Sequence, residues 1–100
     1  MKKQITLDDI KKILRENETV LREKYKISEI GIFGSFVRGE QKKKSDVDIL
    51  VEFSEPMSLF EFIDVEEHLS NILGIKVDLV TKKALKPRIG KRILSEVVYL

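Results

Sequence analysis

An alternation between short strand-like segments and amphipathic helical stretches restricts the fold of this chain more than any other feature. Residues 27–33, 46–53 and 75–81 are short and rich in β-branched side chains, as β-strands are. Around them, apolar residues recur at three- and four-residue spacing, which is typical of helices packed on one side. This order predicts an α/β fold, with a small three- to four-stranded mixed sheet and helices mainly on one face.

The helical stretches have recognisable ends. Thr6 and Asp9 match a capping box, Gly74 stands at a usual helix stop, and Pro87 suits the first turn of a helix. Helices are therefore predicted over 7–24, over 35–40, from the turn at Glu55-Pro56 to Gly74, and from Pro87 onwards. In the third helix the predicted inward residues are Leu59, Phe62, Ile63, Leu69, Ile72 and Leu73. The last helix is predicted to carry Ile89, Ile93, Leu94, Val97 and Val98.

Length and composition exclude several classes of protein. One hundred residues with 42% hydrophobic side chains leave room for one core, so residues 1–100 are expected to form a single domain. Apolar runs are far shorter than the roughly 20 residues that span a membrane. With no cysteine there is no disulfide framework or thiolate metal site, which fits a cytoplasmic protein. Nineteen basic residues against 17 acidic ones argue against direct DNA binding.

Three aspartates suggest a metal site. Asp46 and Asp48 stand two apart on a predicted strand and project from the same side, about 7 Å apart at the backbone. Asp78 interrupts an apolar strand, where a charge is costly unless it is solvated, paired or bound to metal. If the two strands are neighbours, all three carboxylates share one face. Hard oxygen ligands favour Mg²⁺, with Mn²⁺ also suited, and two such ions need shared carboxylates.

Gly34 and Ser35 suggest a binding site for an anion. They stand where a predicted strand ends and a short helix begins, so backbone N–H groups can approach a phosphate closely. Arg38, one turn further on, has two open roles, contacting phosphate or bracing the loop. Each of these features alone is common in proteins without catalytic function. Their conjunction, in this order and spacing, is much more specific.

This set of motifs resembles the DNA polymerase β nucleotidyltransferase superfamily, and within it the minimal nucleotidyltransferase (MNT) group of bacteria and archaea. The resemblance lies in Gly34-Ser35-Phe36-Val37-Arg38-Gly39-Glu40, Ser45-Asp46-Val47-Asp48-Ile49-Leu50-Val51, Lys76-Val77-Asp78-Leu79-Val80 and Ile93-Leu94-Ser95-Glu96-Val97-Val98-Tyr99. It covers nearly the whole chain. One small departure is Val37, where the group often has alanine.

The resemblance implies a polymerase-β-like nucleotidyltransferase fold and a reaction that transfers AMP from ATP. Asp46 and Asp48 would coordinate two Mg²⁺ ions, while Asp78 would complete the metal site and help to deprotonate the attacking hydroxyl. Gly34, Ser35, Arg38 and Ser45 are the implied nucleotide-binding residues. MNT proteins resemble the antitoxin half of modules whose partner is a HEPN ribonuclease toxin. The implied acceptor is then a tyrosine hydroxyl of that toxin, as in a type VII-like antitoxin.

Two other functions remain open at this stage. The first is an antitoxin without catalysis, which binds nucleotide or nothing and masks its partner. The second is transfer of a nucleotide to a small molecule, although relatives that do this carry an added substrate-binding domain. The sequence also leaves open which NTP is preferred and whether the chain forms a homo-oligomer.

Overall fold

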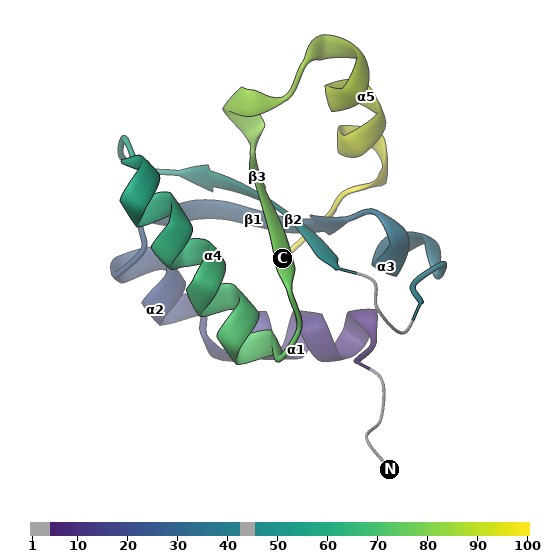
Figure 1. Cartoon of the computed structure of the whole chain (residues 1–100), viewed down its shortest axis with the longest axis horizontal. Helices are drawn as coiled ribbons and strands as arrows, with labels where there is room; N and C mark the ends of the chain where they lie inside the picture. Colours follow the sequence, from purple (N-terminus) through teal and green to yellow (C-terminus); the bar gives the residue numbers. More distant parts are fainter. Residues whose placement is uncertain (1–4, 43–45) are drawn as a thin grey trace.

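The computed structural model describes residues 5–42 and 46–100, and its centre is one mixed sheet (Figure 1). The strands are β1 (Ile27–Phe33), β2 (Val47–Phe53), β3 (Val77–Thr81) and β4 (Val98–Tyr99), in the spatial order β3-β2-β1-β4. β1 is antiparallel to both β2 and β4, whereas β2 and β3 are parallel. Because parallel strands need a long crossover, a helix connects β2 to β3. The predicted α/β class and mixed sheet are confirmed.

Five helices occur in the described residues. They are α1 (Leu7–Glu16), α2 (Glu18–Glu23), α3 (Ser35–Arg38), α4 (Leu59–Leu73) and α5 (Pro87–Glu96), with a 3₁₀ turn, η1, at Lys82–Ala84. Three of the helices, α1, α2 and α4, cover one face of the sheet. The capping box at Thr6 is present, with Asp9 N–H donating to Thr6 Oγ1 at 3.2 Å. The single helix predicted over 7–24 is wrong, because it breaks at Asn17. There the side-chain amide of Asn17 donates a hydrogen bond to the Ile13 carbonyl at 2.8 Å. This local bond competes with continuation of the helix.

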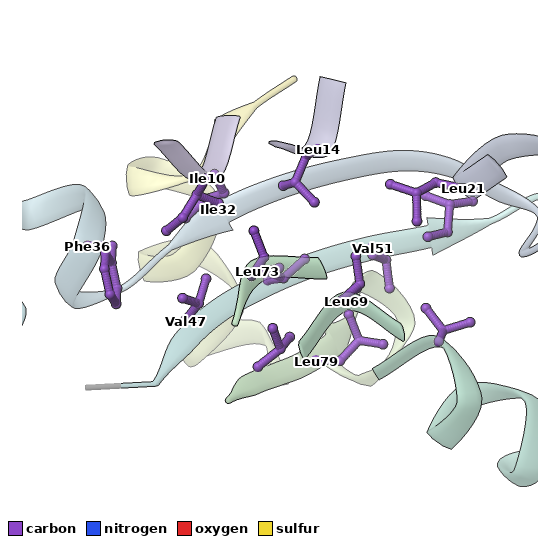
Figure 2. Close-up of a cluster of buried hydrophobic side chains, with 14 residues drawn as sticks. Ile10, Leu14, Leu21, Ile32, Phe36, Val47, Val51, Leu69, Leu73 and Leu79 are labelled. Carbon is purple, nitrogen blue, oxygen red and sulfur yellow. The ribbon is translucent and has the colours of Figure 1, made fainter. Parts of the chain in front are cut away.

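The hydrophobic core lies between one face of the sheet and helices α1, α2 and α4 (Figure 2). Alternate residues of the two central strands point into it, so Val47, Ile49 and Val51 are almost fully buried. The helices contribute Ile10, Leu14, Leu21, Val65, Leu69 and Leu73. Phe36 of α3 packs into the same cluster and is 2% exposed. The core therefore fixes the strands whose opposite face carries the aspartates.

The predicted inward face of α4 is partly wrong. Leu59 and Ile63 are 71% and 42% exposed, whereas Val65 is 1% exposed. Val65, Leu69 and Leu73 recur every four residues and form one stripe against the sheet. Leu59 and Ile63 lie on a flank of the helix, turned away from that stripe.

The end of the last helix also differs from the prediction. α5 ends at Glu96, and Val98 and Tyr99 form β4 beside Ile32 and Gly31 instead of continuing the helix. A Cβ atom at Gly31 would lie 2.6 Å from Val97 Cγ2, so glycine permits this close approach. Unpaired backbone groups on the edge of β1 attract this short strand, a long-range interaction that helical spacing does not reveal.

None of the helices within residues 5–42 and 46–100 has the length and apolar character needed to cross a membrane.

Two substitutions in α4 test this packing. Leu69 is fully buried and Phe60 is 81% exposed. We expect Leu69→Ala to lower the free energy of unfolding by about 2–5 kcal/mol, because it leaves a cavity in the core. Phe60→Ala should change it by less than about 0.5 kcal/mol. Urea denaturation of both variants measures the difference, and equal effects would contradict the described orientation of α4.

Candidate functional site

The parallel pairing of β2 with β3 sets two aspartates side by side. Asp48 and Asp78 are register partners, and adjacent strands lie about 4.8 Å apart. Val47 and Val77, the residues just before them, point into the core, so both carboxylates lie on the opposite face. Asp48 is half-buried and Asp78 is exposed. Sequence reasoning predicted this arrangement on condition that the two strands are neighbours, and they are.

Asp46 lies just before β2 instead of within it. Its carboxylate is 45% exposed, and Lys76 Nζ lies 4.0 Å from its Oδ2. An exposed pair at that distance contributes little to stability. The exposed carboxylate of Asp46 therefore lies just before the start of β2, two residues before Asp48.

Asp48 carries the strongest electrostatic signature of the site. Its pKa is raised to about 6, first by burial and then by negative charge on Asp78 and on Asp46, while Arg38 opposes the shift. The three aspartates therefore interact electrostatically, and their ionised forms repel one another. A raised pKa at a cluster of like charges is common at functional sites, because a bound cation relieves the repulsion.

The three carboxylates do not yet form a closed ligand set. Across residues 5–42 and 46–100, no group of three acidic or histidine side chains is close enough to hold a metal ion without rearrangement. Mutual repulsion is a sufficient physical reason, since uncompensated carboxylates turn apart. The donor chemistry fits a hard divalent cation, because only oxygen ligands are available.

Gly34 lies directly beside Asp48 and must be glycine there. Its φ of +82° is unfavourable for other residues, and an added Cβ would lie 2.0 Å from Asp48 Oδ2. This contact follows from the sheet register, in which Phe33 pairs with Asp48. The glycine expected to let an anion approach thus also makes room for a carboxylate of the aspartate set.

Ser35 begins α3 directly after this glycine and is half-buried. The first backbone N–H groups of a helix have no partner within the helix, so this turn presents donors close to Asp48. Phe36 anchors the turn because its ring is buried in the core. Ser45, the other predicted serine, falls outside the described residues.

Glu96 is a site residue that sequence reasoning missed. Its Oε1 accepts hydrogen bonds from Gly34 N–H at 3.0 Å and from Arg38 Nη1 at 3.0 Å, and Oε2 accepts from Arg38 Nη1 at 3.2 Å. The Glu96 side chain thereby links the end of α5 to the loop between β1 and α3. One feature of the sequence could have pointed to it: Glu96 is the only acidic residue in 79–100.

Arg38 braces this loop, one of the two roles left open for it. Besides Glu96, its Nε donates to Glu40 Oε2 at 3.1 Å. Hydrogen bonds from Arg38 to Glu40 and then to Glu96 raise the pKa of its guanidinium. With both carboxylates engaged, the guanidinium holds the loop in place beside Asp48.

Comparisons with known proteins place this arrangement in a family. The profile of the family described as nucleotidyltransferase domain matches residues 8–100. A protein of Thermococcus cleftensis named protein adenylyltransferase MntA is 53% identical over 96 residues, covering 96% of this chain and 97% of that protein.

Solved structures are similar to this chain over nearly its full length. A protein described as a minimal nucleotidyltransferase superposes with a TM-score of 0.77 and 29% identity, covering 99% of this chain and all of that one. A chain in a toxin–antitoxin crystal structure with AMP-PNP has a TM-score of 0.67 and 25% identity, covering 92% of this chain and 69% of that one. With the family profile and the relative above, these similarities show that the chain belongs to the nucleotidyltransferase domain family, with a minimal nucleotidyltransferase fold.

Proposed function

We propose that this chain transfers AMP from ATP to a hydroxyl group, most specifically a tyrosine, of a partner HEPN toxin, and so acts as an antitoxin. The observation that carries the proposal is the placement of Asp48 and Asp78 side by side, next to Gly34. Asp46 directly precedes β2, the strand that carries Asp48. The name of the Thermococcus relative and the toxin–antitoxin structure with AMP-PNP support the choice of reaction, nucleotide and partner.

In this proposal Asp46, Asp48 and Asp78 hold two Mg²⁺ ions, which would neutralise and align the triphosphate. The Ser35 N–H and hydroxyl would hold phosphate oxygens, and Gly34, whose own N–H donates to Glu96, lets a phosphate approach the backbone closely. Arg38 and Glu96 act as positioning residues, because they fix the loop that carries those donors.

The reaction is an in-line substitution at the α-phosphorus of ATP. The acceptor oxygen forms a bond to that phosphorus, and the bond to the oxygen bridging the α- and β-phosphates breaks, so that pyrophosphate leaves. Asp78 accepts the proton of the acceptor hydroxyl, a role that suits an exposed carboxylate at the edge of the site. Positioning and electrostatic stabilisation supply most of the rate in such transfers.

Removing two of the carboxylates tests the reaction. The protein encoded by the gene adjacent to that of this chain is incubated with the chain, ATP and Mg²⁺, and its mass is measured. We expect the mass to rise by one or more AMP units with the wild-type chain, and not with Asp46→Asn/Asp48→Asn. Asp8→Asn/Asp64→Asn, which removes the same charge from two exposed positions elsewhere, should transfer AMP normally.

Retained transfer by the folded Asp46→Asn/Asp48→Asn variant would exclude these residues as the catalytic carboxylates. A stable complex without any modification would instead favour an antitoxin that masks its partner. Neither complex nor modification would favour a small molecule as the acceptor.

A pair of glycines tests the loop. Gly34 and Gly39 both have positive φ, but an added Cβ meets Asp48 at Gly34 and nothing within 4 Å at Gly39. We expect Gly34→Ala to reduce AMP transfer by about 100-fold, because Asp48 or the loop must move. Gly39→Ala should cost only about 1 kcal/mol of stability, with transfer nearly unchanged. Steady-state transfer rates and urea denaturation compare them, and equal rates would remove the role given to Gly34.

The pKa of Asp48 predicts a pH dependence of stability. Its folded-state pKa of about 6 exceeds the unfolded value of about 3.9, so the folded chain binds more protons between these values. In EDTA, the contribution of Asp48 should therefore become less favourable as pH rises from about 4 to about 6. We expect Asp48→Asn to raise the unfolding midpoint relative to wild type at pH 8, and by less at pH 4.

Mg²⁺ provides the control for this experiment. Saturating Mg²⁺ at pH 8 should raise the unfolding midpoint of the wild-type chain and have less effect on Asp48→Asn. If Asp48→Asn has the same effect at pH 4 and pH 8, repulsion at Asp48 is not the cause.

A further inference from the structure

Helix α5 has an apolar face that the described part of the chain leaves largely uncovered. It stands off from the sheet and from the other helices (Figure 1). Ile89 is 57% and Leu94 46% exposed, and the only buried residue of α5 is Gly90, which packs against Leu85. Ile89, Ile93 and Leu94 lie on one side of the helix. Arg92 and Lys91 flank that side, because each is three residues from an exposed apolar residue, Ile89 and Leu94 respectively.

Residues 82–92, which lead into α5 and include its first half, carry a strong excess of positive charge. Six of the 19 basic residues lie in residues 82–92, which contain no acidic residue. The other 13 basic residues therefore face all 17 acidic ones, a net charge of −4 outside this segment. Lys82 pairs with Glu29 at 3.0 Å, but Lys86, Arg88, Lys91 and Arg92 have no ion pair with any described residue. An unpaired basic cluster attracts an acidic surface.

The position of α5 connects this surface to the candidate site. Its last residue, Glu96, accepts the hydrogen bond from Gly34 N–H. Gly34 in turn touches Asp48. A macromolecule bound along α5 therefore lies next to the aspartates, where an acceptor hydroxyl must arrive.

We propose that the α5 surface, formed by Lys86, Arg88, Ile89, Lys91, Arg92 and Leu94, docks an acidic region of the protein that carries the acceptor hydroxyl. The inference rests on the proposed function, which requires a protein acceptor. Exposed apolar side chains beside unpaired basic ones match the apolar centre and charged rim of protein interfaces. A surface for single-stranded RNA would present aromatic side chains for base stacking, and residues 82–96 contain none.

Charge reversal on α5 tests this surface independently of catalysis. In the Asp46→Asn/Asp48→Asn background, the Kd for the protein of the adjacent gene is measured by calorimetry at two salt concentrations. Adding Arg88→Glu/Lys91→Glu should raise this Kd by about tenfold or more and weaken its salt dependence. Lys11→Glu/Lys12→Glu on α1 makes the same charge change on another helix and should leave the Kd unchanged. Circular dichroism and unfolding midpoints verify that both variants fold.

The outcomes separate this inference from the proposed function. If the wild-type chain transfers AMP but the α5 variant binds as tightly as the α1 control, the docking surface is wrong and the reaction stands. If no transfer occurs yet the α5 variant alone loses affinity, the surface stands and the proposed reaction is wrong.

Three further results would overturn the docking surface. One is that the Asp46→Asn/Asp48→Asn chain with an unchanged α5 does not bind the adjacent-gene protein. Another is a wild-type dimer that becomes a monomer only in the α5 variant, measured by light scattering. The third is α5-dependent binding of a single-stranded RNA oligonucleotide without a protein complex.

Discussion

Parallel pairing between β2 and β3, in the register that sets Asp48 beside Asp78, governs both faces of the sheet. On one face the same register brings Val47 beside Val77 and Ile49 beside Leu79, all buried under the helices. A slip by one residue would put the aspartates into the core and these apolar residues outside it. Burial of the apolar face therefore forces two carboxylates together on the other, although they repel.

Repulsion between the ionised aspartates lowers the stability of the folded chain. Asp48 is half-buried beside Gly34, and both burial and the neighbouring aspartates raise its pKa. Such a carboxylate destabilises the folded chain when it is ionised without a cation. Binding of a divalent ion would relieve the repulsion, so the same charges that weaken the metal-free fold favour the proposed metal. Conflicts of this kind between local energetics and fold are typical of functional sites.

The C-terminal segment, although distant in the sequence from Gly34 and Asp48, supports the candidate site. Glu96 holds the Gly34 loop and Arg38, and β4 then pairs with β1. The end of α5 is thus fixed at the site, while most of its apolar face stays exposed. A chain of this size has little surface with which to grip a large acceptor. The proposed docking on α5 lets the element that braces the loop also position the partner.

The sequence by itself determined three of the four strands, the α/β class and the three candidate aspartates, because these depend on local periodicity and on residue chemistry. It also identified Gly34, since a glycine between a strand and a helix is a local signal. Only the tertiary structure decided that Glu96 braces Arg38, that Val98 joins the sheet, and that Ile63 is exposed. Each of these depends on residues distant in the chain, such as Arg38 and Glu96, which are 58 positions apart. Helical spacing and composition describe near neighbours, whereas packing and edge pairing are long-range interactions.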